Sequence, residues 1–383
     1  MPFYVSAAGR LPGLDLLRAL AIGWIMLYHL ESYGLRLPGP VVAYGWMGVD
    51  LFFVLSGYLI GWQLLRPWAA GARPAWRPWW TQFMLRRSLR ILPVYLAVLA
   101  LYVLLPASGE ADVMRPLWQF LTFTVNLFPG APDARAFSHA WSLCVEEHFY
   151  LLLPPVAWWL ARRPSAGRTV AVALGVLLGG MLLRAWLWQQ ELAPLLGQGA
   201  YVERFIALIY MPSPARLDGL LMGVLLAVTR GFRPAWWAML MARGVLLLVS
   251  GTAGLAGAMW LLRGVPGFAG IVFGFPLLSC SLACLVAGCI SGHTWPGRWR
   301  VPGASTLATL ALSLYLTHKQ VYHALDAALG DALGASPVMA FCVYNGVALL
   351  AAAALYWLVE RPALLLRTRL LASAPVHGLQ PSA

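Results

Sequence analysis

Charged residues are scarce in this chain of 383 residues: only 11% are Asp, Glu, Lys or Arg, whereas 61% are hydrophobic. The mean hydropathy is +0.72. A water-soluble domain cannot hide that much apolar surface, so we predict an integral membrane protein. In lipid, a spanning segment must pair its own backbone groups, as a helix or within a closed barrel, and the long apolar blocks of this sequence favour helices.

Lysine and cysteine are also rare. Of the 27 basic residues, 26 are arginine. The chain has five cysteines, all within apolar runs: Cys144, Cys280, Cys284, Cys289 and Cys342. With no CxxC pair and no histidine cluster at zinc spacing, they are expected to be buried core residues, and we predict no metal site. The first apolar run carries Asp15 and Arg18, so we expect a retained helix and not a cleaved signal peptide.

Ten apolar blocks have about the 20 residues that cross a bilayer. They cover residues 12–31, 46–65, 89–106, 142–160, 169–188, 205–228, 243–262, 268–290, 304–323 and 338–359. The shorter stretch from Pro116 to Phe128 is expected to be interfacial or re-entrant, and counting it as a span would give eleven. We therefore predict an all-α polytopic transmembrane bundle formed by residues 1–371, followed by a short disordered cytoplasmic tail at 372–383.

The basic residues indicate an orientation. With the N-terminus in the cytoplasm, 18 of the 27 fall in cytoplasmic segments and five in outer loops. This bias predicts that both termini are cytoplasmic, and it accounts for the pI near 10.0 without a nucleic-acid partner. The Arg- and Ala-rich composition suggests a bacterial inner (cytoplasmic) membrane. No loop is long enough for a soluble catalytic domain, so any chemistry must come from the helices.

Ionisable residues within predicted spans are costly in lipid and usually line a cavity. Asp15, Arg18 and His29 share one face of the first span, and Arg18 and His29 lie about 16 Å apart along its axis. A membrane histidine is as often a structural hydrogen-bonding group, so His29 alone does not decide the function. Asp50, at the outer end of the second span, needs a partner, and Arg18 or His29 is the nearest candidate.

The third and fourth spans add basic and acidic groups. Arg86, Arg87 and Arg90 at the cytoplasmic mouth of the third span suit either topological anchoring or phosphate binding. In the fourth span, Glu146 shares a face with Ser142 and Tyr150, whereas the neighbouring Glu147 points elsewhere. Because Glu146 and His29 are both expected near the outer end, we predict a pair in which the carboxylate orients the imidazole.

Three landmarks lie further along the chain. Arg216 and Asp218 follow two prolines within the sixth span, which predicts a broken helix that lines a cavity or packs in protein. Tyr315 and His318 lie within the ninth span. Glu360 and Arg361, at the end of the tenth, are expected to form a local pair.

In this order and spacing, the motifs resemble those of the integral-membrane acyltransferases called acyltransferase family three. The resemblance extends over about residues 11–365. It comprises Arg18 and His29 with ten residues between them, Gly48-Val49-Asp50 through Ser56-Gly57, Arg86-Arg87-x-x-Arg90, Trp141-Ser142-Leu143-x-x-Glu146, and the weaker Arg216-x-Asp218, Tyr315-Leu316-x-His318 and Glu360-x-Pro362.

The resemblance implies a cytoplasmic acyl-CoA donor, most often acetyl-CoA, and a hydroxyl acceptor on an extracytoplasmic glycan or glycolipid. We expect His29 to be the general base, supported by Glu146 and Asp50, and we expect Arg18, Arg86, Arg87 and Arg90 to hold the donor. The remaining substrate-binding candidates are Ser142, Tyr150, Arg216, Asp218, Tyr315 and His318. Proteins of polysaccharide biosynthesis or export are possible partners. Only about a dozen residues follow the last predicted helix, so we expect no SGNH-type esterase-like domain.

Two other classes of protein fit part of the pattern. A transporter also uses intramembrane acids, arginines and histidines together with broken helices, although the two halves of this chain show no internal symmetry. A non-enzymatic component of a polysaccharide export complex would use the same polar residues only to hold helices together. Consumption of acyl-CoA separates the enzyme from both alternatives.

Overall fold

The computed structural model describes residues 11–35, 39, 41–106, 109–111, 113–128, 130, 133–334 and 336–372. Across these ranges the chain is helical, and the extended pairing found there is an isolated bridge between Met114 and Ala136. The prediction of an all-α fold is therefore confirmed. The predicted tail, apart from Ala372, lies outside the described residues.

The helices follow one another with short connections. They are α1 (Pro12–Leu30), α2 (Met47–Ala69), α3 (Trp76–Leu104), α4 (Leu117–Leu121), α5 (Trp141–Arg162), α6 (Ala166–Leu187), α7 (Ala200–Phe205), α8 (Asp218–Phe232), α9 (Pro234–Ala242), α10 (Gly244–Leu261), α11 (Phe275–Ile290), α12 (Trp295–Arg298), α13 (Ala304–Leu333), α14 (Pro337–Leu355) and α15 (Arg361–Ala372). Four π-helical turns extend or join them: Trp188–Leu192, Ile206–Tyr210, Gly270–Gly274 and Tyr356–Glu360. Short 3-10 turns are Glu31–Tyr33, Val42–Tyr44, Ser138–Ala140, Ala193–Leu195 and Ser213–Ala215.

Seven helical segments in the described part of the chain are long and apolar enough to cross a membrane. They are Pro12–Tyr33, Met47–Ala69, Trp76–Leu104, Ala166–Leu195, Gly244–Leu261, Gly270–Ile290 and Pro337–Ala372. The chain is thus a multi-pass membrane protein. Helices α5 and α13 are also long, but they are not among these seven segments. Both carry acids and histidines, and α13 also carries a lysine. The count of ten spans and the orientation of the termini stay predictions.

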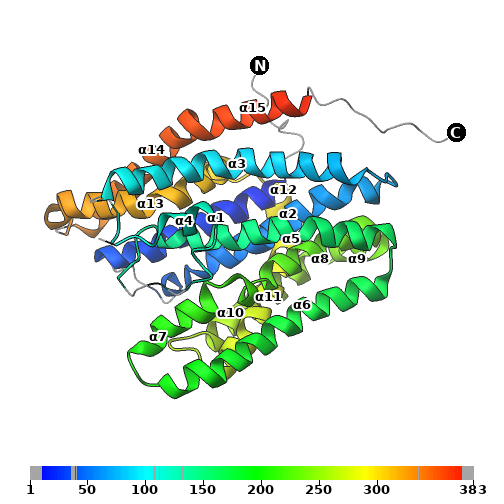
Figure 1. Ribbon diagram of the computed structural model, residues 1–383, viewed down its shortest axis with the longest axis horizontal. Helices are drawn as coiled ribbons and strands as arrows, with labels where there is room; N and C mark the ends of the chain where they lie inside the picture. Colours follow the sequence, from blue (N-terminus) through cyan, green and yellow to red (C-terminus); the bar gives the residue numbers. More distant parts are fainter. Residues whose placement is uncertain are drawn as a thin grey trace.

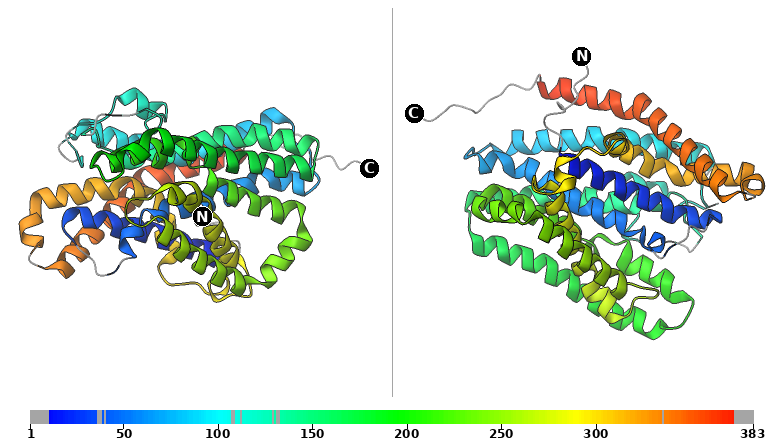
Figure 2. Two further views of the ribbon diagram at one scale, coloured as in Figure 1. Left: turned by 90° about the horizontal axis from the view of Figure 1, so that it is seen from below. Right: turned by 180° about the vertical axis from the view of Figure 1, so that it is seen from behind.

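Helix α1 runs through the middle of the bundle and packs on α2, α11 and α13. Figure 1 shows α1, α2, α3, α5 and α13 running along one another, with α6, α10 and α11 gathered on one side and α14 with α15 on the other. The views in Figure 2 place α1 in the same central position. Asp15 on this helix is accordingly buried, at 7% exposure.

Two glycines allow α2 and α8 to pack closely. A β-carbon added at Gly57 would lie 2.1 Å from the carbonyl oxygen of Leu220, and one at Gly223 would lie 2.2 Å from that of Val54. Only glycine tolerates such backbone contact, as is common where membrane helices meet. Gly57, at the end of the motif in the second span, therefore lies at a close helix contact.

Several predicted boundaries differ from the structure. Helix α3 begins at Trp76 and not near residue 89, because its first turns pack through aromatic contacts of Trp76 and Trp79 with Trp158 of α5. Helix α13 continues ten residues beyond 323, to Leu333. The last span does not end near 359, since a π turn carries the helix into α15.

The sixth predicted span is interrupted, as its prolines indicate. A π turn at Ile206–Tyr210 and a 3-10 turn at Ser213–Ala215 separate α7 from α8. The Ser213 hydroxyl accepts a hydrogen bond from the Asn126 amide (2.8 Å) and lies 2.6 Å from His148 Nδ1. The broken backbone is thus held inside the protein, which confirms this prediction.

Two of the side-chain predictions are wrong. Cys144 and Cys289 are buried, but Cys280 and Cys342 lie on the outside of the molecule. Glu360 does not pair with Arg361. Its carboxylate accepts a hydrogen bond from Ser313 on α13 (2.8 Å), while the Arg361 guanidinium lies 4.2 Å from the Trp357 ring centre.

Candidate active site

One face of α13 passes two cavities in succession. Successive turns present Ala308, Ala311, Tyr315 and Lys319, and then His323, which is the three-to-four-residue spacing of one helical face. The first part of this face lines a cavity of about 340 Å³, and the later part lines a cavity of about 950 Å³. We call these the arginine cavity and the histidine cavity.

The arginine cavity is lined by Arg18 of α1 and by Arg87 and Arg90 of α3. Arg87 donates a hydrogen bond to Gln63 of α2 and lies over the ring of Tyr150 at 5.8 Å. Arg18 pairs with Asp15 one turn earlier on α1 (3.2 Å). Arg86, the third arginine of the α3 motif, is not among the residues that line this cavity.

The acidic group of this cavity lies on α5. Ser142, Glu146 and Tyr150 line it together, as their four-residue spacing predicts, whereas Glu147 does not. Glu146 accepts hydrogen bonds from the hydroxyls of Tyr150 (2.7 Å) and Ser56 (2.8 Å). The predicted pair of Glu146 with His29 is therefore not formed, because the two carboxylate oxygens bond within the arginine cavity.

The histidine cavity contains His29 near the end of α1. Its other walls include the rings of Trp46, Trp141 and Tyr210, together with Lys319. Trp141 packs against Tyr210 with ring centres 4.8 Å apart, and Trp46 meets the same tyrosine edge-on at 5.6 Å. The cavity therefore offers aromatic faces and charged groups beside the histidine.

The partner of His29 is His318 of α13. Nδ1 of His29 lies 2.7 Å from Nε2 of His318, and Nδ1 of His318 lies 2.9 Å from the carbonyl oxygen of Leu314. A carbonyl oxygen only accepts, so the neutral His318 ring carries its proton on Nδ1 and accepts at Nε2. His29 must then donate from Nδ1, which leaves its Nε2 unprotonated and able to accept a proton.

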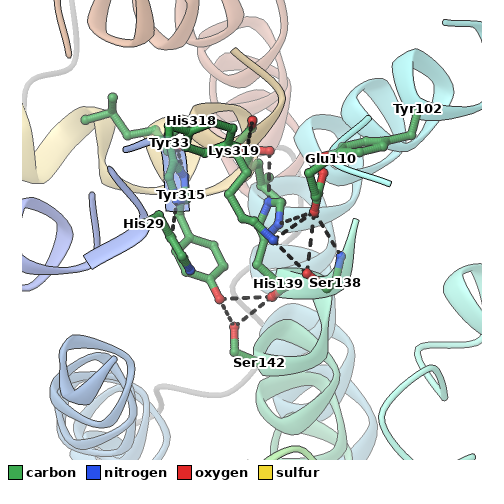
Figure 3. A network of polar contacts seen from close by, with 12 residues as sticks. His29, Tyr33, Tyr102, Glu110, Ser138, His139, Ser142, Tyr315, His318 and Lys319 are labelled. Carbon is green, nitrogen blue, oxygen red and sulfur yellow. Dashed lines mark hydrogen bonds and ion pairs between the residues drawn. The ribbon is translucent and has the colours of Figure 1, made fainter. Parts of the chain in front are cut away.

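A second polar cluster ties the loop before α5 to α13 (Figure 3). Glu110 accepts hydrogen bonds from Lys319 (3.0 Å) and Tyr102 (2.6 Å), and it lies 3.7 Å from Nδ1 of His139. Lys319 also donates to Ser138 (2.7 Å). Burial raises the pKa of the Glu110 carboxyl, but Lys319, His139 and Tyr102 outweigh it and hold that pKa well below its ordinary value of 4.5.

Tyr315 stands where the two cavities meet. Of the described residues, Val49 and Tyr315 line both. The Tyr315 hydroxyl donates to the carbonyl oxygen of His139 (2.9 Å) and lies 2.7 Å from the Ser142 hydroxyl. Figure 3 shows its ring beside His29 with the hydroxyl directed at Ser142. The two cavities therefore adjoin at Val49 and Tyr315.

The structure gives Asp50 a different partner from the one expected. Its carboxylate is buried and bonds Arg216 of the broken segment at 2.7 Å, and not Arg18 or His29. The Arg216 guanidinium is enclosed by aromatic rings, with centres 4.4 Å away at Phe275 and 4.6 Å at Tyr210. Asp50 therefore positions Arg216 and does not touch His29.

Asp218 also bonds within the protein interior. It forms two hydrogen bonds with Arg184 of α6, at 2.6 and 3.2 Å. Neither Arg216 nor Asp218 is among the residues lining the two cavities. Both side chains take part in buried ion pairs that hold the break before α8.

Sequence reasoning missed Glu110, His139 and Gln63. Glu110 lies in the loop that follows α3, where the sequence around it gave no signal of its own. His139 lies two residues before Trp141 of the Trp141-Ser142-Leu143 motif, which is the one hint that it is buried near the site. Among the described residues, no group of three or more His, Cys, Asp or Glu side chains is arranged to hold a metal ion.

The chain is similar to proteins of known family. The chain matches the family described as the acyltransferase domain, acyltransferase 3, over residues 11–357. It is 28% identical over 184 residues to the peptidoglycan O-acetyltransferase OatA of Listeria monocytogenes, an alignment covering 43% of this chain and 28% of that protein. No solved structure matches the chain significantly.

Two proteins of Staphylococcus aureus are similar to a comparable extent. The O-acetyltransferase OatA is 30% identical over 166 residues, covering 40% of this chain and 26% of the relative. A putative O-acetyltransferase of strain COL is 32% identical over 158 residues, covering 38% and 24%. The chain thus spans about a quarter of the length of the curated relatives it matches.

Proposed function

Because the chain belongs to the acyltransferase 3 family, we propose that it moves an acyl group, in the simplest case acetyl, from acyl-CoA to a hydroxyl of a glycan or glycolipid. The observation that carries this proposal is the meeting of an arginine-lined cavity with a histidine-lined cavity at Val49 and Tyr315. A donor with phosphates and an acceptor with a hydroxyl each have a cavity of suitable chemistry.

The donor binds in and at the mouth of the arginine cavity. Arginine suits phosphate oxygens because its planar guanidinium donates two parallel hydrogen bonds. A cavity of about 340 Å³ is small for a whole CoA molecule, so it accommodates the acyl group and the narrow arm that carries it. Arg87 and Arg90 then lie near the phosphates, and Arg18 lies along the path of the thioester.

The acceptor hydroxyl binds in the histidine cavity, beside His29. Its oxygen attacks the thioester carbonyl carbon as Nε2 of His29 takes the hydroxyl proton. The bond between carbon and sulfur breaks, and the proton passes to the departing CoA thiolate. His318 acts as the positioning residue that fixes the His29 tautomer, a role assigned above to Glu146 on sequence grounds.

The acceptor class is supported by two facts. The histidine cavity presents aromatic rings, on which the apolar faces of sugars stack, together with charged groups that bond hydroxyls. One relative is named a peptidoglycan O-acetyltransferase. With the arginine bias placing the donor side in the cytoplasm, we propose a bacterial inner-membrane enzyme that modifies an extracytoplasmic glycan, alongside proteins that make or export it.

The proposed function is tested by release of the CoA thiol from acetyl-CoA by detergent-purified protein, with and without envelope glycolipids. We expect acceptor-dependent release by the wild type. His29→Ala should lower the rate by roughly 10²–10⁴-fold, because a general base contributes about that much. His293→Ala is the matched control, since His293 is exposed on a loop.

Full activity of folded His29→Ala protein would refute the role of this residue. No release by the folded wild type with any acyl-CoA would refute the enzyme itself and favour the transporter.

A further inference from the structure

The two cavities share two lining residues, Val49 and Tyr315. Val49 lies in the first turns of α2 and is 6% exposed, and Tyr315 is 7% exposed. Both line the arginine cavity and the histidine cavity. The route of an acyl group from the arginine cavity to the histidine cavity is therefore expected to run past these two side chains, and we call this route the passage.

The Val49 side of the passage cannot retreat. A β-carbon added at the preceding Gly48 would lie 2.7 Å from the carbonyl oxygen of Ala21, so the start of α2 is pressed directly against α1. The neighbouring Asp50 is fixed by its ion pair with Arg216. The backbone of Val49 is therefore held on both sides.

The Tyr315 side is fixed by hydrogen bonds. Its hydroxyl bonds the His139 carbonyl oxygen and the Ser142 hydroxyl, and both of these belong to the segment that begins α5. The ring cannot swing away from the passage without breaking these bonds. Besides Tyr315, α13 contributes Ala308, Ala311 and Leu312 to the arginine cavity.

We propose that Val49 and Tyr315 form a size filter that restricts the transferred acyl group to short chains. This inference rests on the proposed function. The tail of an acyl group entering from the arginine cavity precedes or accompanies its carbonyl carbon through the passage. Acetyl carries a single methyl group beyond that carbon, whereas a longer tail must displace side chains that the structure holds in place.

The experiment compares kcat/KM for acetyl-, propionyl-, butyryl- and hexanoyl-CoA, using wild-type protein and an envelope glycolipid acceptor. The wild type should prefer acetyl-CoA. Val49→Ala removes two methyl groups from the passage and should raise the butyryl-to-acetyl ratio by about ten-fold or more, since a methylene in an apolar pocket discriminates by roughly 10–200-fold. Val49→Ile adds a methyl group and should lower the propionyl-to-acetyl ratio.

The matched control is Val54→Ala. Val54 lies on the same helix and is fully buried, but it packs near Gly219 of α8 and is not among the residues lining either cavity. It loses the same two methyl groups, so its acyl-chain ratios should equal those of the wild type. A general loosening of α2 would change both alanine variants alike.

Three results overturn the inference. Acetyl transfer with an unchanged chain-length ratio in both Val49 variants refutes the size filter and leaves the proposed function standing. Equal use of hexanoyl-CoA and acetyl-CoA by the wild type does the same. Absence of transfer from every acyl-CoA by folded wild-type protein refutes the proposed function, and the filter with it.

Discussion

The state of His29 is set by a chain of hydrogen bonds that starts at a backbone carbonyl group. Leu314 holds the proton of His318 on Nδ1, and His318 in turn holds the proton of His29 on Nδ1. Nε2 of His29 is left as the acceptor. A second neutral imidazole can orient a base in this way without placing a negative charge beside it.

The sequence indicated His29, His318 and Glu146 as individual site residues but did not indicate which of them pair. The two histidines are 289 positions apart on different helices. Their contact depends on how α1 packs against α13, which a single sequence does not specify. The shared face of Ser142, Glu146 and Tyr150 was predictable, because it depends only on the geometry of one helix.

Arg90 offers a test of donor binding. It lines the arginine cavity and is solvent-exposed, so its side chain is available to a phosphate. Arg90→Ala should raise the apparent KM for acetyl-CoA by about 10- to 100-fold with little change in kcat, because a hydrogen bond to a charged group is worth roughly 1.5–3 kcal/mol. Steady-state kinetics with varied acetyl-CoA measure this.

Arg86→Ala provides the comparison for that experiment, since Arg86 belongs to the same motif but does not line the cavity. Its KM should stay near the wild-type value. An Arg90→Ala enzyme with an unaltered KM would show that the donor phosphates bind elsewhere.

Among the elements, the broken segment before α8 depends on buried charge. Asp50 joins it to α2 through Arg216, and Asp218 joins α8 to α6 through Arg184. All four side chains are buried. The prolines in the sequence predicted the break, but the ion pairs that stabilise it join residues far apart in the chain and could not be assigned in advance.

Removing one partner of such a pair leaves an uncompensated buried charge. Asp50→Ala should therefore destabilise the fold by about 3–5 kcal/mol, whereas Asp50→Asn with Arg216→Met should recover much of the loss. Thermal unfolding in detergent, followed by size-exclusion chromatography of the surviving protein, measures both. A catalytic role for Asp50 predicts the opposite pattern: stable, inactive protein in the single variant and no recovery in the double variant.

An ion pair between Glu110 and Lys319 joins the segment between α3 and α5 to α13. The pKa of Glu110 is lower in the folded state than its ordinary value of 4.5, so the carboxylate stabilises the fold above that pH. This stabilisation is lost as the pH falls below 4.5. In Lys319→Met this pH-dependent loss should be smaller, because without the cation the pKa of Glu110 moves back toward its ordinary value.

Melting temperatures recorded between pH 7 and pH 3 for the wild type and Lys319→Met measure the contribution of this ion pair to stability. The two curves should differ most near neutral pH and converge in acid. Parallel curves across the whole range would mean that Lys319 does not stabilise the ionised form of Glu110.

In the whole molecule, α1 and α13 connect the two cavities. Arg18 and His29 occupy opposite parts of α1, and the face of α13 runs from Ala308 in one cavity to His323 in the other. The order of these groups along each helix was readable from the sequence. The meeting point at Val49 and Tyr315 was not, because it arises where four helices converge.

The central claim is that the acyl group crosses the protein from the arginine cavity to the histidine cavity. It is tested most directly with membrane vesicles of known sidedness and radiolabelled acetyl-CoA, which does not cross lipid. Inside-out vesicles, which expose the cytoplasmic face, should label a glycan or glycolipid enclosed in their interior, and His29→Ala vesicles should not. Equal labelling by sealed right-side-out vesicles, or labelling confined to the face that receives acetyl-CoA, would contradict the account.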